Sequence, residues 1–401
     1  MDTGLPRRGP GASNMRGTEG NGLHTMNRLL AVGMYTTVGP RCGIADYTRD
    51  LSSALGLHVS VTIVPICRGN LNPFATVLAG LRLGRNDVAH IQHTYSFFGV
   101  DPLTYTLLIR LLLRSIRAPI VLTAHTVRES GPARYEGGLG SALANVVGAP
   151  AWQDTETFRR PDAIIVHTAY HKERLAARGL PADRIHVIPP GVPAHVRVEP
   201  AEVSAFCTRF GFPSDRPVIG VFGFLEGSKR FLDLLNAVAA LPGRPTLLVA
   251  GGPRLPNQRQ AAAKLRTAAE RLGIDDRLVI TGYLQAAAVP VALEAMDLVV
   301  VPYATDESMS YSLHRALGQF RPVVATDLPT LREVEARGHC LALVPPADPV
   351  TLHKTLAALL EDVPARGRLV AAAKEYAARE GPAVAAARTA RVYACIHAAH
   401  G

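Results

Sequence analysis

The stretch VPYATDESMSYSLHRALGQFRPVVATDLPT (residues 301–330) decides the class of fold. It predicts a buried apolar strand, an acidic turn, a helix whose Leu313 and Leu317 form a buried face, and a second apolar strand. Near-continuous apolar strands that alternate with helices are typical of a parallel sheet covered on both faces. The same alternation recurs through most of the chain.

Two series of such strands follow one another along the 401 residues. The first series is RLLAVGMY, HVSVTIVPI, DVAHIQH, PIVLTAH, DAIIVHT and RIHVIPPGV. The second is PVIGVFGF, PTLLVAGG, RLVITGY, DLVVVPY, PVVATDL and CLALVPP. The predicted fold class is therefore α/β, with two Rossmann-like, doubly wound parallel-sheet domains that face each other across a cleft.

The domain limits follow from the same two series. The opening residues 1–26 are polar and Gly-rich, and we expect a disordered leader there. The Pro-rich IPPGVPAHVRVEP separates a first domain at 27–195 from a second at 196–383. The helical tail, residues 384–401, is expected to cross back to the first domain.

The composition limits the classes of binding partner and the cellular compartment. Forty-three Lys and Arg against 33 Asp and Glu give a formal charge of +10, which favours anionic partners. Because the basic residues form no long run, nucleic acid is less favoured than anionic lipid or phosphorylated metabolites. The five scattered cysteines lack a C-x-x-C pair and favour a reducing, cytoplasmic compartment. The chain contains no run of about 18 apolar residues, so no membrane-spanning helix is predicted.

The segment PLTYTLLIRLLLRSIRAP (102–119) allows two interpretations. It places Arg110, Arg114 and Arg117 on one helical face among Leu and Ile residues. Such a basic helix surface is suited to peripheral contact with the inner face of an anionic membrane. A core helix with a basic, solvated edge is the favoured alternative.

Ligands of open parallel sheets bind beyond the carboxyl ends of the strands. After strand 28–35, the turn TTVGPRCGIADYT contains Gly39 and Gly43, which permit close backbone approach of a phosphate or sugar to a helix N-terminus. After the strand that ends at Gly223, Lys229 precedes a helix and is suited to neutralise a diphosphate. A simple Gly turn and a solvated surface lysine are the alternatives.

The turn in the opening stretch supplies a further set of candidates. Glu307 is expected to accept hydrogen bonds from sugar hydroxyls, while the N–H groups of residues 309–312 bind phosphate. A carboxylate that only caps the helix is the alternative. The predicted donor-binding residues of this turn are Asp306, Glu307, Ser308, Met309 and Ser310.

Two histidines end strands of the first domain. His125 and His93 are each placed to orient a substrate at the cleft, or else to be satisfied by the backbone in a structural role. His93 and its neighbour Gln92 are assigned to the acceptor side. With no H-E-x-x-H, no Asp-x-Asp and no His/Cys cluster, no metal site is predicted.

Eight motifs together carry a resemblance to a known family. After residue 27 the chain resembles the retaining, GT-B-fold glycosyltransferases of the "group 1" family, in the glycogen-synthase-like superfamily. The motifs, in the family's order, are GPRCGIADYT, DVAHIQHTYSFFG, VLTAHT, IIVHTAYHKERL, VIPPGV, GFLEGSKRFLDLLNAV, LLVAGG and ALGQFRPVVATDLP.

The resemblance implies a nucleoside-diphosphate sugar, UDP- or GDP-linked, in the second domain and a hydroxyl acceptor in the first. Lys229 would contact the diphosphate, Glu307 the donor sugar, and His125 the transferred hexosyl group near its reacting centre. Retention of configuration without a metal or other cofactor is also implied. The sequence departs from the family where an Arg usually precedes the Lys, at Phe224, and where a second Glu usually holds the ribose, at Arg315.

Two other functions are compatible with the same plan. One is a sugar-nucleotide epimerase or a phosphorylase, although no added set of acid/base carboxylates is evident. The other is a catalytically silent protein that binds sugar nucleotides or partners a transferase, for which Arg315 is the best argument because a guanidinium cannot accept hydrogen bonds from ribose hydroxyls. The sequence does not specify the acceptor, the base or the oligomeric state.

Overall fold

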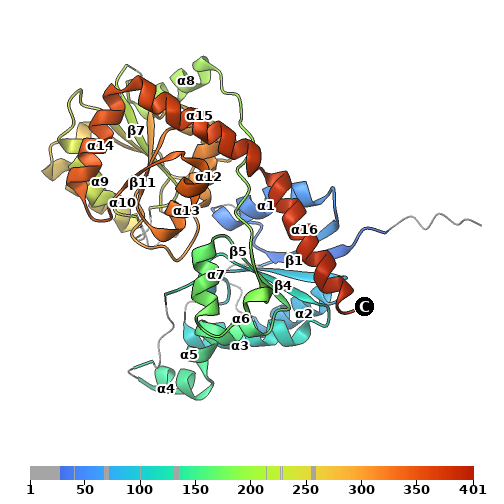
Figure 1. Cartoon of the computed structure of the whole chain (residues 1–401). Helices are drawn as coiled ribbons and strands as arrows, with labels where there is room; N and C mark the ends of the chain where they lie inside the picture. Colours follow the sequence, from blue (N-terminus) through green and yellow to red (C-terminus); the bar gives the residue numbers. More distant parts are fainter. Residues whose placement is uncertain are drawn as a thin grey trace, which may run out of the picture.

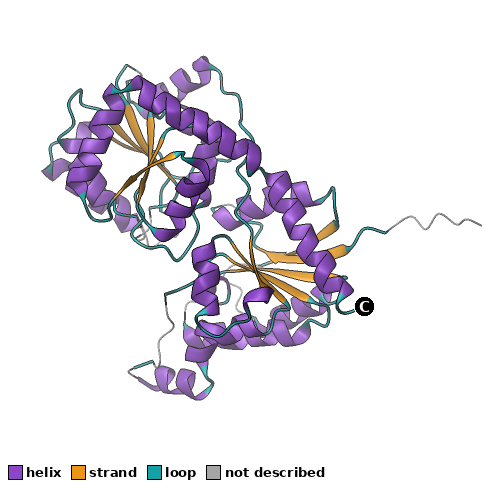
Figure 2. Ribbon diagram, in the orientation of Figure 1, coloured by secondary structure: helices purple, strands orange, loops and turns teal. Residues whose placement is uncertain are grey.

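The computed structural model describes residues 28–39, 41–66, 72–99, 101–129, 135–136, 138–213, 215–225, 227, 229–253 and 259–401. The leader expected at 1–26 lies outside the described residues. Within the described chain, two parallel six-stranded sheets occupy two lobes (Figure 1), which confirms the predicted fold class. Helices cover both faces of each sheet, as Figure 2 shows.

The first sheet has the strand order β2-β1-β3-β4-β5-β6. Its buried strands are rich in Val and Ile, which pack well on a pleated surface that is covered on both faces. The strands are β1 (Ala31–Thr36), β2 (Ser60–Pro65), β3 (Val88–His93), β4 (Ile120–Ala124), β5 (Ala163–Val166) and β6 (Ile185–Val187). The helices between them are α1 (Gly43–Leu55), α2 (Pro73–Leu83), α3 (Pro102–Ser115), α4 (Gly138–Val146), α5 (Ala149–Ala151), α6 (Thr157–Arg159) and α7 (Ala169–Ala176), with short turns η1 (Tyr95–Phe97), η2 (Trp152–Glu156) and η3 (Ala182–Arg184).

The second sheet has the order β12-β11-β10-β7-β8-β9. Its strands are β7 (Val218–Phe222), β8 (Thr246–Ala250), β9 (Leu278–Ile280), β10 (Leu298–Val301), β11 (Val323–Thr326) and β12 (Leu341–Val344). Its helices are α8 (Pro200–Phe210), α9 (Phe231–Ala239), α10 (Arg259–Arg271), α11 (Ala288–Glu294), α12 (Tyr311–Gly318), α13 (Pro329–Gly338), α14 (Pro349–Glu361) and α15 (Val363–Arg379), with the short turn η5 (Asp275–Arg277).

The last helix, α16 (Pro382–Ala398), leaves the second lobe and lies beside α1 and β1 of the first (Figure 1). Its Ala385, Ala386 and Tyr393 are buried in one cluster with Val32 and Met34 of β1. The chain passes between the two domains once near Val192 and again near Glu380. These two segments are in contact, since the Val192 N–H donates to the Glu380 carbonyl at 2.7 Å. A single core therefore includes residues from the start and the end of the chain.

The helix α3 packs into the core of the first domain. Its Leu108, Ile109, Leu112 and Leu113 are buried, as expected of the core-helix interpretation of 102–119. The helix ends at Ser115, so the expectation that Arg117 shares its basic face is wrong. No helix among the described residues is both long enough and apolar enough to cross a membrane.

Candidate active site

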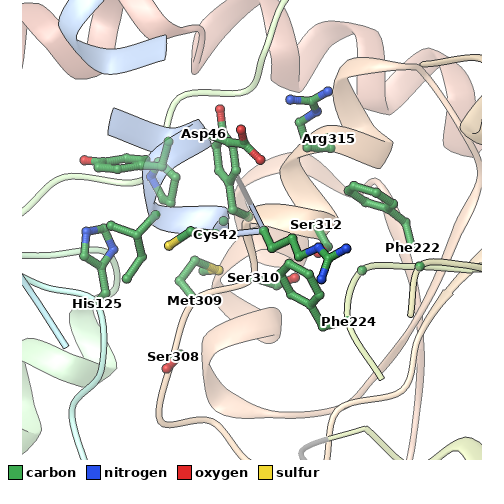
Figure 3. A pocket seen from close by; sticks show the side chains of 18 of the residues that line it. Cys42, Asp46, His125, Phe222, Phe224, Ser308, Met309, Ser310, Ser312 and Arg315 are labelled. Atoms are coloured by element: carbon green, nitrogen blue, oxygen red, sulfur yellow. The ribbon is translucent and has the colours of Figure 1, made fainter. Parts of the chain in front are cut away.

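The carboxyl ends of the two sheets face each other across a cavity of about 380 Å³ (Figure 3). In both sheets the lining residues follow the strands, where loops and helix N-termini converge. The first domain contributes Arg41, Cys42, Gly43, Ile44, Asp46, Tyr47, Thr94, Ser96, His125, Thr126, His167 and Pro190. The second contributes Phe222, Gly223, Phe224, Lys229, Ala250, Gly251, Gly252, Tyr283, Leu284, Ala286, Val289, Tyr303, Ser308, Met309, Ser310, Tyr311, Ser312 and Arg315.

The loop between β1 and α1 spans the cleft. Arg41 has a left-handed backbone with φ of 63°. Its guanidinium carbon lies 5.1 Å from the ring centroid of Tyr283 in the second domain. Gly43 lines the cavity and Gly39 does not. A Cβ added at either glycine would meet no atom within 4 Å, so the space beside them is open.

Lys229 lies against the turn that follows β7. Its Nζ donates to the Phe224 carbonyl at 2.6 Å and lies 5.8 Å from the ring centroid of Tyr303. Gly223 has φ of +116°, and an added Cβ would come within 2.8 Å of Ser312 Oγ and 3.1 Å of Lys229 Nζ. The turn therefore needs glycine both for its backbone conformation and for the close approach of the lysine.

The stretch before α12 divides between the cavity and the other domain. Ser308, Met309 and Ser310 line the cavity. The helix cap is Ser310, whose Oγ accepts from the Leu313 N–H at 3.0 Å, so the alternative in which a carboxylate of the acidic turn caps the helix is wrong. The capping residue must directly precede the first helical turn, and α12 begins only at Tyr311.

The carboxylates of Asp306 and Glu307 are not among the cavity-lining residues, which differs from their expected place at the donor. Asp306 Oδ1 lies 3.3 Å from Nη1 of Arg174 on α7. The carbonyl of Glu307 accepts from the Val127 N–H at 2.8 Å. Burial raises the pKa of Tyr95 to about 12, and the Glu307 carboxylate adds a smaller increase. Both residues therefore face the first domain in this structure.

His125 reaches the cavity, and its ring is held by two neighbours. Its Nε2 lies 2.7 Å from the side-chain amide of Gln92, and its Nδ1 lies 3.3 Å from Nε2 of His167. Gln92 is fully buried and supports His125 from behind. Burial lowers the pKa of His125 well below its usual range and that of His167 to about 4, so both rings are neutral near pH 7.

His93 does not lie at the cleft, contrary to its expected acceptor-side position. It is fully buried, with Nε2 2.9 Å from the Tyr105 hydroxyl and its ring stacked on Phe98. Burial lowers its pKa to about 3. The end of β3 places this side chain toward the core, which is the structural role left open by the sequence.

The cavity carries a positive bias. Its described lining residues include the cations Arg41, Lys229 and Arg315 and one carboxylate, Asp46. The N-terminus of α12 adds N–H groups with partial positive charge. In Figure 3 His125 lies on one side of the cavity, and Arg315, Ser310 and Ser312 lie on the other. This arrangement suits an elongated anion with hydroxyl groups.

Several lining residues were not singled out from the sequence. Arg41 and His167 stand in motifs that the sequence had already marked, GPRCGIADYT and IIVHTAYHKERL, so position within those motifs was an available signal. Tyr283 and Tyr303 end two of the predicted strands, where a search of every strand end would have found them. Among the described residues, no group of three His, Cys, Asp or Glu side chains is arranged to hold a metal ion.

Two family models match consecutive parts of the chain. The model described as "Glycosyltransferase Family 4" matches residues 47–196, and that described as "Glycosyl transferases group 1" matches residues 216–362. The two matched parts correspond to the two lobes that enclose the cavity.

Curated relatives are similar over both domains. A D-inositol 3-phosphate glycosyltransferase of Xylanimonas cellulosilytica is 30% identical over 69% of this chain, and the chain spans 66% of that relative's length. A 2-deoxystreptamine N-acetyl-D-glucosaminyltransferase of Streptomyces fradiae is 28% identical over 82% of this chain and 79% of its own.

Solved structures share the fold over nearly the whole chain. HepE of Anabaena in complex with UDP has a TM-score of 0.67 at 17% identity, covering 91% of this chain and 100% of its own. Sucrose-phosphate synthase of Thermosynechococcus elongatus has a TM-score of 0.68 at 17% identity, covering 92% and 100%. The fold is that of two-domain, GT-B proteins. Each of the two domains therefore resembles a glycosyltransferase family, and the chain shares the two-domain fold of the solved glycosyltransferase structures.

Proposed function

We propose that this protein transfers a hexosyl sugar from a nucleoside-diphosphate sugar to a hydroxyl acceptor with retention of configuration. The observation that carries the proposal is the cavity between the carboxyl edges of the two sheets, which Arg41, Lys229, Arg315 and the α12 N-terminus make positive. The names of the relatives, all transferases of sugars, support the same reaction class.

The proposed chemistry is the departure of a diphosphate from the sugar it carries. Lys229 and the helix N–H groups stabilise the charge that develops on the leaving group, and this effect strengthens as closure excludes water. The acceptor hydroxyl then attacks the anomeric carbon from the face that the diphosphate leaves. Its proton passes to an oxygen of that diphosphate, so the new glycosidic bond replaces the old one with the same configuration and no metal or enzymic nucleophile takes part.

A thermal-shift screen with UDP, GDP and their glucose or mannose conjugates tests donor binding. A ligand at about 100 times its dissociation constant stabilises the folded state by about 2.7 kcal/mol. We expect a clear shift with one of the two bases. If no diphosphate shifts the unfolding temperature, the proposal fails.

Turnover is tested with the donor found in that screen and a cell extract as the source of acceptor. A glycosylated product supports transfer, an isomerised donor indicates an epimerase, and binding without turnover indicates a silent protein. Lys229→Ala should lower turnover by about 10²-fold or more because it removes a charge at the leaving group. Lys354→Ala, on the exposed surface of α14, is the matched control and should keep full turnover.

We also propose peripheral contact of the first domain with an anionic membrane. Its outer helices expose Phe74 on α2 (85% exposed) and Leu139 and Val146 on α4, and Arg114 is exposed on α3 between them. Co-sedimentation with vesicles should be stronger with phosphatidylglycerol than with phosphatidylcholine and should weaken in Phe74→Asp. If the same amount of protein sediments without vesicles as with them, the proposed membrane contact is rejected. The cytoplasmic location stays a prediction.

A further inference from the structure

A line of buried polar side chains runs behind His125 from the C-terminal helix to the cleft. The hydroxyl of Tyr393 on α16 lies 2.6 Å from His90 Nδ1, and His90 Nε2 lies 3.3 Å from the amide of Gln92. Gln92 then meets His125, and His125 meets His167. His90, Gln92 and Tyr393 are fully buried, so each polar atom needs a partner within the protein. His90 Nε2 has a second partner beside the line, the Thr123 hydroxyl at 2.7 Å.

The hydrogen bond between His167 and the Ile188 carbonyl determines which ring nitrogens of His167 and His125 are protonated. His167 Nδ1 is 2.9 Å from the Ile188 carbonyl, which only accepts hydrogen bonds, so Nδ1 of His167 carries a proton. Because this ring is neutral, its Nε2 carries no proton and offers a lone pair. Nδ1 of His125 must therefore donate to it, and neutral His125 is left with a lone pair at Nε2.

The lone pair on His125 Nε2 in turn decides the orientation of Gln92. The Gln92 atom 2.7 Å from this lone pair is placed as Oε1, which only accepts. A lone pair needs a donor there, so the amide must be turned over to present its NH2 group to His125. The two ends of an amide have the same shape, and their partners decide which is which. The carbonyl of Gln92 then faces His90 Nε2, which is a donor when His90 Nδ1 accepts from the Tyr393 hydroxyl. That Nε2–H is shared between the Thr123 hydroxyl at 2.7 Å and the Gln92 carbonyl at 3.3 Å.

We infer that a one-way hydrogen-bond chain, from Tyr393 through His90, Gln92, His125 and His167 to the Ile188 carbonyl, holds His125 as the tautomer protonated at Nδ1. His167 and Gln92 are positioning residues that act through His125. The functional consequence rests on the proposed function: both ring nitrogens of His125 are engaged, Nδ1 by His167 and Nε2 by Gln92, so the chain fixes the orientation in which this ring borders the sugar site. The chain also gives the crossing helix α16 a link to the cleft beyond its apolar packing.

The tautomers are read directly from ¹⁵N-labelled histidine by long-range ¹H–¹⁵N correlation at neutral pH. We expect a protonated Nδ1 and an unprotonated Nε2 for both His125 and His167, and the reverse for His90. A proton on Nε2 of His125, or a doubly protonated ring, would overturn the inference. This reading does not depend on whether the protein transfers a sugar.

Three variants test what sets the tautomer. His167→Phe removes the acceptor of Nδ1, and His125 should then move its proton to Nε2. His167→Gln offers a carbonyl to His125 and an NH2 to Ile188 in the same order, so the wild-type pattern should persist. Gln92→Glu places a carboxylate, which only accepts, beside Nε2 of His125 and should bring a proton to that nitrogen.

The control is His186→Gln, at a half-buried position on the neighbouring strand β6. It should leave the signals of His125 unchanged. An unchanged tautomer in both His167→Phe and Gln92→Glu would refute the chain. Because Gln92→Glu leaves His167 in place, the test survives if His167→Phe fails to fold.

Catalytic consequences are measured with UDP-glucose or GDP-mannose, whichever donor binds. His167→Phe should lower kcat about fivefold, the worth of one ordinary hydrogen bond, with little change in KM, and His167→Gln should restore it. An equal loss in both variants would refute the positioning role. If neither nucleotide binds the wild-type protein, the proposed function fails while the tautomer result stands.

Discussion

Arg315 is the residue at which this chain departs most clearly in charge from the family that it resembles. Its side chain is half-buried, lines the main cavity and also borders a second cavity, lined by Asp50, Pro193 and Gln319 among others. A guanidinium has five donors and no acceptor, so it suits an anionic group and not a hydroxyl proton. It adds positive charge to the cavity, which suits the nucleotide donor of the proposed function.

We predict that Arg315→Glu weakens binding of the preferred nucleoside diphosphate by about tenfold or more, since a hydrogen bond to a charged group contributes about 1.5–3 kcal/mol. Isothermal titration with UDP and GDP measures the change. Arg315→Lys keeps the charge without the planar fork and should lose less. Unchanged or tighter binding by Arg315→Glu would show that the guanidinium does not serve the nucleotide.

The sequence located part of this site and missed the rest for a geometric reason. Strand ends are visible in the sequence, so Gly223, Lys229 and Ser308–Ser310 were found at the cavity edge. The direction of each loop side chain depends on the partner domain, which the sequence does not display. Asp306 and Glu307 therefore face α7 and Val127 instead of the cavity.

At the scale of elements, the parallel strands were predictable because all four residues of β10 and of β11 are buried and apolar or β-branched. The start of α12 was not predictable, because the acidic turn resembles a cap and Ser310 supplies the actual one. Which face of the first domain α16 covers was also not evident, since its apolar residues are mostly alanines.

Tyr393 is the polar anchor of α16. Removing its hydroxyl leaves Nδ1 of His90 as a buried acceptor without a donor, so Tyr393→Phe should lower the free energy of unfolding by about 1–3 kcal/mol. Urea denaturation measures this difference. Tyr376→Phe on α15 is the control, because the described residues show no hydrogen bond to the Tyr376 hydroxyl. Equal losses in the two variants would contradict the anchoring role.

At the scale of the whole molecule, buried histidines make stability depend on pH. Burial lowers the pKa of His90 and His93 to about 3 and that of His167 and His314 to about 4, below the ordinary 6.5. Between those values the unfolded chain binds more protons than the folded one. Stability is therefore fully present above about pH 6.5 and falls as the pH drops toward 4, with no further loss from these groups below their folded pKa values.

We predict that each such histidine contributes a slope of at most about 1.4 kcal/mol per pH unit in this window. The free energy of unfolding, measured by urea titration at several pH values, should therefore rise less steeply with pH in His167→Gln than in the wild-type protein. A parallel dependence in the two proteins would mean that His167 is already protonated in the folded state.

The two domains are held together by polar contacts from α13 and the 306–308 loop to the first domain. The carboxylate of Glu333 accepts from the Ala169 and Tyr170 N–H groups at 2.8 and 2.7 Å, at the positive N-terminus of α7. His171 Nε2 donates to the Asp306 carbonyl at 2.8 Å. These contacts favour the arrangement of the two domains seen in this structure, here called the closed form. A ligand that binds to both domains in this arrangement would stabilise it further.

Glu333→Ala should therefore loosen the closed form without unfolding α7, which Thr168 still caps through the His171 N–H. The loss of two charge-assisted hydrogen bonds should weaken nucleotide binding by about tenfold, because affinity falls with the fraction of closed protein. Small-angle scattering should show a larger radius of gyration without ligand and a return toward the wild-type value at saturating nucleotide. Glu375→Ala on the exposed side of α15 removes the same charge away from the interface and should change neither quantity. If Glu333→Ala matches this control in both measurements, packing alone holds the two domains in this arrangement and the α13 carboxylate at the α7 N-terminus has no part in it.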